Sequence, residues 1–331
     1  MATYKGIQGT TVQSFASDPT PTANFVGQLW YNSTSGTFKI ATEGAGAWTS
    51  ANSLSGTGRQ QSDMVGNKTA AIIMGGDYTW PHTYPTWSET YDGTSWTEGN
   101  DINEGRINAA ACGAGVPACL FIGGTDSPAG QLASVEQYNG TCWSEVNDLN
   151  DSRRAGTAAG TVTAALLAGG SSPGSTNSVE YYDGTSWTEG NNLQSPNEAG
   201  QGNGTSTAAF ITGGNPPATR TEIYNGTSWS NANSMQNEKT SGAAAGTTTS
   251  GLVFGGYDSS SPAPTDTGQT ESYDGTSWTE VGDMGTARTG VAGNGPSNQA
   301  AIVASGYTTV YLALCEEWTS PLYVVKTVTT S

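Results

Sequence analysis

The sequence has few positively charged residues. Only 11 of its 331 residues are lysine or arginine, whereas 28 are aspartate or glutamate, and the formal net charge is −17. Proteins that bind nucleic acids need clustered cations to neutralise phosphate groups, so we do not expect a nucleic acid as a partner. The same shortage disfavours binding to an anionic membrane surface. We interpret the acidity mainly as a contribution to solubility in a salty medium.

Long hydrophobic runs are also missing. No stretch approaches the ~20 apolar residues that a membrane-spanning helix needs. The segment Met1–Lys5 lacks the apolar core of a secretory signal. No segment of sufficient length repeats apolar residues at helical spacing. The sequence therefore predicts neither a membrane segment nor a helical core.

The four cysteines, Cys112, Cys119, Cys142 and Cys315, do not have the spacing of zinc ligands. Cys112 and Cys119 flank a predicted hairpin, where a cross-strand disulfide is one alternative. In the other repeats described below, the position of Cys119 holds a small residue: Ala71, Ala165, Ala209, Gly251 and Ala301. This pattern indicates a buried slot for a small side chain, so we expect free, buried thiols and no metal or other cofactor.

A six-residue phrase that begins with tyrosine and ends with tryptophan recurs along the chain. Four copies read Tyr-(Asp/Asn)-Gly-Thr-Ser-Trp, and a fifth, Tyr138–Trp143, has cysteine in place of serine. The four copies occupy Tyr91–Trp96, Tyr182–Trp187, Tyr224–Trp229 and Tyr273–Trp278. Regular repeats indicate an array of small structural units, each of which buries its hydrophobic face against its neighbours.

A short apolar run that ends in two glycines precedes each phrase, as at Gly75–Gly76, and a sixth, degraded copy ends in Ser305–Gly306. Each tryptophan of the array lies 26 or 27 residues before the next pair. The distance from a pair to the following tryptophan varies between 13 and 23 residues. Buried strands cannot accept insertions without a change of register, but surface loops can. We therefore expect the variable segments to be exposed loops that lie on one face of the array.

Each unit is predicted to contain four short strands. The first is rich in small residues, as at 109–112, and the second is the apolar run before the glycines. The third ends at the tyrosine of the phrase and the fourth begins at its tryptophan, because Asp-Gly and Asn-Gly between two strands are strong signals of a tight hairpin. Four-stranded units of 40 to 50 residues are typical of propeller blades, so the predicted fold class is all-β.

The apolar run, the two glycines, and the tyrosine and tryptophan at fixed spacing together resemble the Kelch repeat. A basic residue about sixteen positions before each glycine pair adds to the resemblance. That position holds Arg59, Arg106, Arg153, Lys239 and Arg288, whereas Asn197 departs from the pattern. The resemblance covers roughly residues 48–318 and implies a six-bladed Kelch-like β-propeller. It does not settle the function, because this fold hosts enzymes, scaffolds and binding modules.

We divide the chain into three segments on this basis. Residues 1–47 form an N-terminal hairpin arm, residues 48–318 form the propeller, and residues 319–331 form a C-terminal strand or tail. Counting Trp318, the chain has seven equivalent tryptophans but only six glycine positions. We expect the extra tryptophan, Trp48, on a strand from the N-terminal side that helps to close the ring. A seven-bladed ring is the alternative. It requires the hairpin at 29–40 to complete another blade with residues 323–328.

The segment from Gly27 to Lys39 is similar to a small hairpin near the start of bacteriophage tail and fibre proteins. The whole chain, acidic and rich in Gly, Ser and Thr, resembles Kelch-type virion proteins of marine cyanophages. This resemblance implies a location in the virion, multiple copies per particle, and other tail or capsid proteins as partners. It makes Trp30, Tyr31 and Phe38 candidate residues for docking to the particle. An ordinary capping hairpin on the propeller is the alternative.

The sequence does not predict an enzyme. Copper radical oxidases of the Kelch fold need two histidines, and this chain has only His82. Sialidase propellers need three convergent arginines, but most arginines here recur at one repeat position, where we expect them to tie neighbouring blades together. The aspartates mostly occupy turns, where they stabilise the local backbone. No catalytic acid pair and no metal ligands can therefore be named.

Two variable loops carry the candidate ligand-binding residues. The loop of the first unit contributes Trp80, His82, Tyr84 and Trp87. The loop of the fifth unit contributes Tyr257 and Asp258. Aromatic planes suit the apolar faces of sugars, and prolines in both loops reduce the ordering cost of binding. In the alternative interpretation, the two tryptophans cover the end of the first blade or pack against a neighbouring virion protein.

We therefore expect a non-enzymatic virion structural protein, a propeller displayed on the tail or capsid of a bacteriophage. Its loop face is expected to bind a host-surface glycan or a neighbouring virion protein. One alternative is a Kelch-type protein-interaction scaffold that is not part of a particle. A second alternative is a glycan-active hydrolase, which would release oligosaccharides from host polysaccharide.

Overall fold

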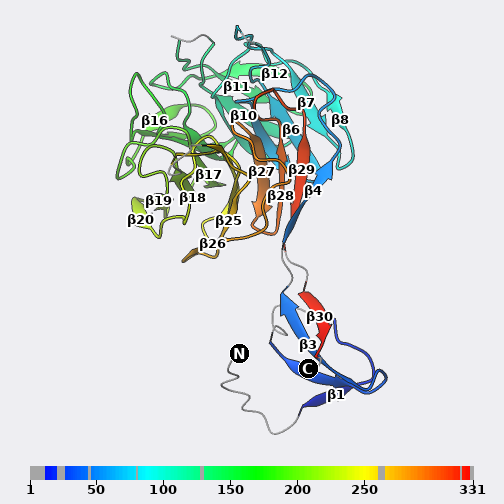
Figure 1. The fold of residues 1–331 in the computed structure, drawn as a ribbon. Coiled ribbons are helices and arrows are strands. Elements are labelled where there is room, and N and C mark those ends of the chain that lie inside the picture. The colour runs from blue at the N-terminus through cyan, green and yellow to red at the C-terminus, as the bar shows by residue number, and fades with distance from the viewer. Residues whose placement is uncertain are drawn as a thin grey trace. The chain divides into compact units, whose positions relative to one another are not determined.

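A computed structural model of the chain describes residues 12–20, 27–43, 46–79, 81–126, 130–259, 265–320 and 323–328. These residues contain strands and no helix (Figure 1), which confirms the prediction of an all-β fold. The chain divides into two compact units. The larger unit is Ala47–Thr319, and the smaller unit combines Met1–Gly46 with Ser320–Ser331.

The described residues of the larger unit form six four-stranded antiparallel sheets, which we number one to six along the chain. Sheet one contains β5 (Asp63–Asn67), β6 (Ala70–Met74), β7 (Ser88–Tyr91) and β8 (Trp96–Glu98). Sheet two contains β9 (Ala110–Gly115), β10 (Ala118–Ile122), β11 (Val135–Tyr138) and β12 (Trp143–Val146). Sheet three contains β13 (Thr157–Thr161), β14 (Ala164–Ala168), β15 (Val179–Tyr182) and β16 (Trp187–Glu189).

The other three sheets follow the same plan. Sheet four contains β17 (Gly200–Thr205), β18 (Ala208–Gly213), β19 (Thr221–Tyr224) and β20 (Trp229–Ala232). Sheet five contains β21 (Ala243–Thr247), β22 (Ser250–Phe254), β25 (Thr270–Tyr273) and β26 (Trp278–Glu280). The segment that connects its second and third strands contains a two-stranded ribbon, β23 (Tyr257–Asp258) and β24 (Thr265–Asp266). Sheet six contains β27 (Ala292–Ser297), β28 (Ala300–Ala304), β29 (Cys315–Thr319) and β4 (Ala47–Ala51).

The hairpin within each phrase forms as predicted, with the third strand ending at the tyrosine and the fourth beginning at the tryptophan. Tyr91 lies directly opposite Trp96, and four residues, 92–95, connect the two strands. Of these four, Gly93 alone has a positive φ, 92°. Asp92 Oδ1 accepts a hydrogen bond from the Ser95 N–H at 2.8 Å, and backbone hydrogen bonds of this kind lower the pKa of the carboxyl group. The turn is therefore stabilised by a side chain that caps backbone N–H groups.

The core of the larger unit lies between adjacent sheets. The apolar second strands are buried almost completely, as the 0% exposure of Ile72 and Ile73 shows. Leu120 of sheet two, Leu167 of sheet three and Trp187 of sheet three belong to one hydrophobic cluster. Each sheet thus buries its faces against its two neighbours, which is why a single unit is not expected to fold alone.

The tryptophan that begins each outer strand packs toward the third strand of the preceding sheet. Trp278 Nε1 donates to Thr221 Oγ1 of β19 at 3.1 Å. The equivalent first position of β15 is Val179, which shares a core cluster with Trp229. Since valine offers no acceptor, Trp229 Nε1 has no hydrogen-bond partner among the described residues. The repeat therefore tolerates an unsatisfied buried indole donor at this position.

The glycine pair connects one sheet to the next. Gly75 and Gly76 have φ values of 63° and 108°, a region that favours glycine. The Gly76 N–H donates to the Arg106 carbonyl at 3.0 Å, in the connection that leads to sheet two. The equivalent bond recurs at every junction between sheets. It includes the bond from the Gly306 N–H to the Arg59 carbonyl at 2.8 Å, which joins sheet six to sheet one.

The same basic residue extends its side chain into the sheet that follows it. Arg106 forms an ion pair with Glu136 of β11, and neither side chain is more than 1% exposed. The five buried pairs are Arg59–Glu89, Arg106–Glu136, Arg153–Glu180, Lys239–Glu271 and Arg288–Glu316. Each of these cations thus binds one sheet through its carbonyl and the next through its side chain. The expectation that they tie neighbouring sheets together is confirmed.

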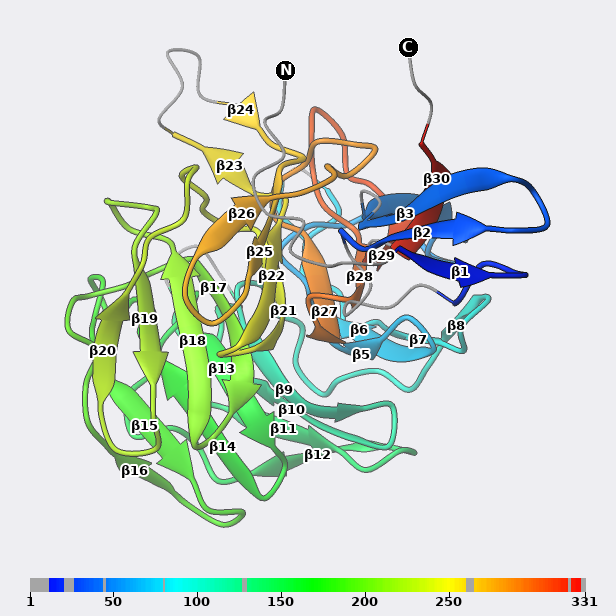
Figure 2. The ribbon, with the colours of Figure 1, turned by 90° about the horizontal axis from the view of Figure 1, so that it is seen from below.

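The first strands of the six sheets lie toward the middle of the larger unit (Figure 2). β5, β9, β13, β17, β21 and β27 each contact the next in order, and β27 contacts β5. Just before these strands, six backbone N–H···O=C bonds of 2.7–3.2 Å join one sheet to the next and return to their starting residue. This backbone cycle consists of Gln61, Asn108, Ala155, Ala199, Ser241 and Gly290.

The N-terminal strand β4 supplies the fourth strand of sheet six. It pairs antiparallel with β29 and places Trp48 opposite Trp318. This pairing confirms that Trp48 lies on a strand contributed from the N-terminal side. It also covers the edge of β29, and exposed edges of this kind invite aggregation.

The smaller unit contains a four-stranded sheet of its own. Its strands are β1 (Gln13–Phe15), β2 (Leu29–Asn32), β3 (Thr37–Glu43) and β30 (Tyr323–Thr327), in that order. β1 runs parallel to β2, and the other pairs are antiparallel. The predicted hairpin at 29–40 therefore does pair with the C-terminal strand, but this sheet belongs to the smaller unit rather than to the array of the larger unit.

All four cysteines are free, as predicted. Cys112 lies opposite Leu120 and Cys119 lies opposite Gly113, so the two thiols point to opposite faces of sheet two and cannot be bridged. Cys112, Cys119 and Cys315 are buried, whereas Cys142 is exposed. The expectation of a buried thiol is therefore wrong for Cys142, which replaces the exposed serine of the turn phrase.

Candidate functional site

The loops between the second and third strands meet at one edge of the larger unit, which we call the loop edge. They range from seven residues at 214–220 to fifteen at 255–269. Loops of neighbouring sheets contact one another, since Asn215 Nδ2 donates to Ser175 Oγ at 3.0 Å and the Tyr311 hydroxyl donates to Asp77 Oδ2 at 3.1 Å. The second of these bonds joins the loop of sheet six to that of sheet one. The variable segments therefore gather where the sequence analysis expected a common face.

Asp77 organises the loop of sheet one. It is fully buried, and its Oδ2 accepts hydrogen bonds from His82 Nδ1 at 2.6 Å and from the Tyr311 hydroxyl. Its Oδ1 accepts the Thr83 N–H at 3.3 Å. Burial and the charge of Asp77 raise the pKa of Tyr311 to about 12. Asp77 is thus a structural group that fixes the orientation of His82, and the side chain of His82 remains 34% exposed.

His82 and Tyr84, two of the predicted binding residues, lie together. Their ring centroids are 6.2 Å apart with an interplanar angle of 21°. Burial and the nearby carboxylates of Asp77 and Asp126 raise the pKa of Tyr84, so its hydroxyl keeps its proton at neutral pH. The two rings form a wall whose polar atoms remain hydrogen-bonding groups.

The two predicted tryptophans of this loop are placed differently. Trp87 is half-buried and packs against Tyr78, with ring centroids 4.8 Å apart. This packing agrees with the alternative in which Trp87 covers the end of sheet one. Trp80 lies outside the described residues.

A cavity of about 230 Å³ opens beside His82 and Tyr84, and we call it the loop cavity. Its further polar lining comes from Gln61, Asn108, Thr125 and Arg154. Gln61 and Asn108 belong to the backbone cycle, and Arg154 lies in the connection to sheet three. The structure therefore brings His82 and Tyr84 together with an arginine that the sequence analysis did not assign to a site.

Tyr257 and Asp258, the other predicted pair, do not line the loop cavity. They form β23, where they pair with β24, and the Tyr257 N–H donates to the Thr240 carbonyl at 2.8 Å. The side chain of Tyr257 is 37% exposed. This second predicted site is therefore a separate, exposed ribbon on sheet five.

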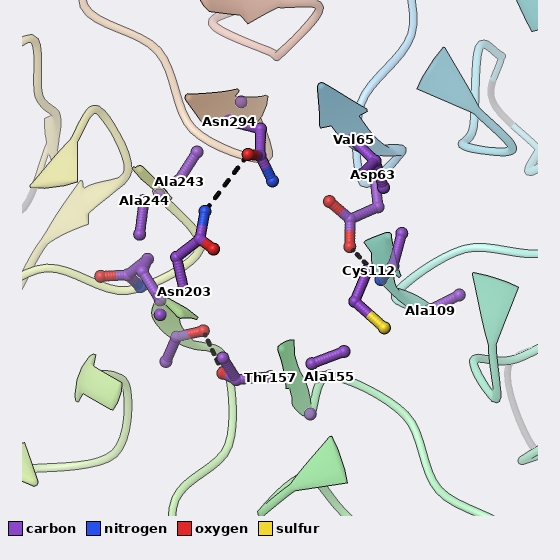
Figure 3. A pocket seen from close by; sticks show the side chains of 18 of the residues that line it. Asp63, Val65, Ala109, Cys112, Ala155, Thr157, Asn203, Ala243, Ala244 and Asn294 are labelled. Carbon is purple, nitrogen blue, oxygen red and sulfur yellow. Dashed lines mark hydrogen bonds between the residues drawn. The ribbon is translucent and has the colours of Figure 1, made fainter. Parts of the chain in front are cut away.

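A second cavity of about 160 Å³ runs along the first strands, where glycine and alanine predominate (Figure 3). Asp63 and Cys112 face it from one side, and Asn203 and Asn294 from the other. Asn203 Nδ2 donates to Asn294 Oδ1 at 3.2 Å, and Asp63 Oδ2 accepts the Ala111 N–H at 2.7 Å. The small first-strand residues leave this central cavity because larger side chains would fill it.

The groups in the central cavity do not form a nucleophilic site. Burial raises the pKa of Asp63 to about 7 and that of Cys112 to about 12. A cysteine reacts as its thiolate, which requires a lowered pKa. The Cys112 thiol therefore stays protonated at neutral pH, and nothing in this cavity activates it.

The three predicted docking residues belong to the sheet of the smaller unit. Trp30 is only 2% exposed, and its Nε1 donates to Asp18 Oδ1 at 3.1 Å, so it forms part of the interior of this unit. Tyr31 and Phe38 lie opposite each other on β2 and β3, with ring centroids 5.3 Å apart. Phe38 is 46% exposed. Phe38 and Tyr31 thus form an exposed aromatic pair on this sheet.

The glutamates that pair with the repeated cations were not predicted as partners. Their signal is present in the sequence, since glutamate stands two positions before the tyrosine or tryptophan of every unit. These residues are Glu89, Glu136, Glu180, Glu222, Glu271 and Glu316. Arg154 was not predicted as a site residue either, because it follows the repeat arginine Arg153 directly and has no sequence signal of its own.

Within the described residues, no group of three or more His, Cys, Asp or Glu side chains lies close enough to hold a metal ion. The same part of the chain contains no helix with the length and apolar character needed to cross a membrane. No protein-family model matches the chain, and no curated protein matches it.

Proposed function

We propose that this chain is a non-enzymatic structural protein of a bacteriophage virion. In this proposal the smaller unit docks to the tail or capsid, and the larger unit displays its loop edge. The observation that carries the proposal is the division into two compact units, in which both ends of the chain contribute to one small sheet. An attachment part and a recognition part are what a displayed virion protein needs. The resemblance to Kelch-type virion proteins of marine cyanophages supports the same conclusion.

The larger unit is proposed to be a closed, six-bladed, Kelch-like β-propeller. The six sheets and the backbone cycle support this architecture, because the cycle returns to Gln61 after six bonds. The pairing of β4 with β29 supports closure as well, since it completes sheet six. A seventh blade is disfavoured because the hairpin at 29–40 pairs within the smaller unit.

The loop edge is proposed to recognise a host-surface glycan. Support comes from the loop cavity, where the stacked rings of His82 and Tyr84 lie beside Arg154. A neighbouring virion protein is the other partner that such an edge would suit. Enzymatic turnover is not proposed, because Asp77 is committed to hydrogen bonds and the Cys112 thiol is not activated.

The proposal is tested with purified cyanophage tails and capsids. The full chain is expected to co-sediment with one of these assemblies, and Phe38→Ser should reduce the bound fraction because Phe38 is an exposed aromatic of the docking sheet. Val310→Ser is the matched control, since Val310 is 56% exposed but belongs to the larger unit. Antiserum against the chain should also label intact particles in electron micrographs.

Absence of both co-sedimentation and labelling would overturn the virion proposal and favour a free interaction scaffold. Incubation with host polysaccharide addresses the hydrolase alternative. The proposal predicts that no oligosaccharide is released. If oligosaccharide release stays with the full chain through successive purification steps, the protein is an enzyme.

A further inference from the structure

The six arginines of the chain differ in their surroundings. Five are buried or nearly so, with side-chain exposures between 0% and 16%: Arg59, Arg106, Arg153, Arg220 and Arg288. The side chain of Arg154 is 37% exposed. Its nearest carboxylate oxygen, on Glu198, is 3.8 Å from Nη2, which is too far for a hydrogen bond. Arg154 is therefore the one guanidinium of this chain that is open to an external anion.

Three other polar side chains of the loop cavity also lack hydrogen-bond partners among the described residues. The side-chain amides of Gln61 and Asn108 and the hydroxyl of Tyr84 form no hydrogen bond with any described residue. The backbone cycle fixes the main chain of Gln61 and Asn108, so their side-chain amides are attached at fixed points of the cavity wall. A few convergent polar groups beside an aromatic wall are typical of a small-molecule site.

The aromatic wall is already ordered. Asp77 holds His82 through Nδ1, and His82 stacks with Tyr84. A ligand therefore does not have to immobilise these rings, which reduces the entropic cost of binding. At about 230 Å³, the cavity is smaller than the pockets of ~300–1,000 Å³ that take drug-sized ligands. It fits one sugar residue rather than an oligosaccharide.

We propose that the loop cavity binds a monosaccharide unit that carries a carboxylate, such as a uronic acid residue of a surface polysaccharide. The Arg154 guanidinium binds the carboxylate, because its planar fork matches two carboxylate oxygens. The amides of Gln61 and Asn108 bind hydroxyl groups, and Tyr84 covers the apolar face of the sugar ring. This inference rests on the proposed glycan recognition and specifies the class of sugar that the loop edge selects.

Glu198 modulates this site. Glu198 Oε1 lies 3.8 Å from Arg154 Nη2, and Glu198 Oε2 accepts a hydrogen bond from the Ser175 hydroxyl at 2.9 Å. The Glu198 carboxylate offsets part of the Arg154 charge, so a bound carboxylate competes with it. Glu198→Gln keeps an acceptor for Ser175 and removes the competing charge. This variant should bind the acidic sugar about threefold more tightly than the parent chain.

The test measures binding of methyl β-D-glucuronide and methyl β-D-glucoside to the full chain by saturation-transfer NMR and calorimetry. The glucuronide should bind at least about tenfold more tightly, because a charged hydrogen-bonded pair is lost with the neutral sugar. Methyl β-D-glucose 6-sulfate is the third probe, and it should bind more weakly than the glucuronide. Added salt should weaken glucuronide binding alone.

Two variants distinguish binding in the loop cavity from a general effect of the protein's charge. Arg154→Gln should reduce glucuronide affinity by about tenfold and leave binding of the glucoside unchanged. Lys68→Gln is the matched control, because it removes one positive charge from sheet one at a residue that does not line the cavity. Thermal unfolding of Arg154→Gln should match that of the parent, since the Arg154 side chain forms no hydrogen bond with a described residue and its ion pair with Glu198 is partly exposed. Lys68 donates one exposed hydrogen bond to Thr319, so its variant should lose little stability.

Equal affinity for glucuronide and glucoside, or equal losses in the two variants, would overturn the inference. So would the absence of glucuronide binding at concentrations up to about 50 mM. These outcomes leave particle association unaffected, so the virion proposal stands or falls separately. Conversely, glucuronide binding by a protein that never associates with particles would support the site and refute the virion function.

Discussion

At the scale of single residues, the structure depends on charges that are buried and paired in each repeat. Five of the six units place a cation against the same glutamate position. Sheet four is the exception, because Asn197 replaces the cation and Glu222 is approached instead by Arg220 at 3.5 Å. Removing one partner of a buried pair leaves an uncompensated charge, which costs more than the pair itself contributes.

Glu136→Gln is therefore expected to lower the free energy of unfolding by about 2 kcal/mol, because the buried Arg106 then keeps only the exposed Glu104, 3.5 Å away, as a counter-charge. Glu222→Gln is the matched control. Arg220 is 16% exposed and also donates to the Pro196 carbonyl, so it can reorient toward water and the loss should be smaller. Urea unfolding followed by tryptophan fluorescence measures both changes. Equal losses would contradict a special role for the repeated pair.

The carboxyl group of Asp63 gives a second residue-scale prediction. Burial raises its pKa from 3.8 to about 7, so the folded state disfavours its ionised form. The penalty is absent below pH 3.8, grows as the pH rises, and is complete above pH 7. Asp63→Asn removes this penalty, but its single acceptor oxygen can serve only one of the Met64 and Ala111 N–H groups that the two carboxylate oxygens accept. The stability of the variant relative to the parent should therefore rise by about 2 kcal/mol between pH 4 and pH 8. Chemical unfolding of both proteins at the two pH values measures this, and a pH-independent difference would refute it.

At the scale of strands and hairpins, neighbouring sheets are joined where an outer-strand tryptophan meets the third strand of the preceding sheet. Trp48 Nε1 donates a hydrogen bond to Thr270 Oγ1 at 2.9 Å. Trp229 packs instead in a cluster with Val179, and its Nε1 has no hydrogen-bond partner among the described residues. An unsatisfied buried donor costs about 1–3 kcal/mol. The repeat therefore contains a position at which stability can be gained.

Val179→Thr is expected to raise the free energy of unfolding by about 1 kcal/mol, because it provides Trp229 Nε1 with an acceptor of nearly the same shape as valine. Thr270→Val is the reverse change and should lower it by about 1–3 kcal/mol, since Trp48 Nε1 then loses its partner. Thermal and urea unfolding measure both. Destabilisation by Val179→Thr would mean that the hydroxyl cannot reach the indole.

Much of the strand and hairpin structure was predictable from the sequence, because the repeat phrase fixes where the strands lie and how they pair. The Tyr–Trp pairing of each hairpin, the apolar second strands and the added strand of Trp48 follow from spacing alone. The conformation of the turn was not predicted in this detail, since the capping role of Asp92 depends on a side-chain hydrogen bond that spacing does not reveal.

The candidate site was less accessible, because it depends on contacts between distant loops. His82 and Tyr84 were named from composition, but Asp77 meets Tyr311 across 234 positions of sequence. Arg154 enters the loop cavity from the connection to sheet three, two repeats away from His82. Neither fact follows from a local pattern, so both required the three-dimensional arrangement of the sheets.

At the scale of the whole molecule, the chain combines one unit built from a continuous segment with one built from two distant segments. The larger unit needs β4, because this strand pairs with β29 and contributes the buried Trp48. The smaller unit contributes no strand to the six sheets. Residues 47–319 therefore contain everything that the described sheets of the larger unit require.

A chain of residues 47–319 should accordingly unfold cooperatively, with the same midpoint as the corresponding transition of the full protein. A chain of residues 52–319 lacks β4 and should be less stable by at least about 3–5 kcal/mol, the cost of removing a buried tryptophan. It should also aggregate, because the edge of β29 is then exposed. Calorimetry and size-exclusion chromatography compare the two. Equal stability would mean that β4 is dispensable.

The pairing of β3 with β30 has a consequence for synthesis on the ribosome. Glu43 meets Tyr323, so about 280 residues must be translated between two strands that lie side by side. The sheet of the smaller unit is consequently completed last, after every repeat has emerged. A chain that terminates before β30 lacks the strand that completes this sheet. If the virion proposal is right, incorporation into particles therefore selects full-length copies without any separate proofreading factor.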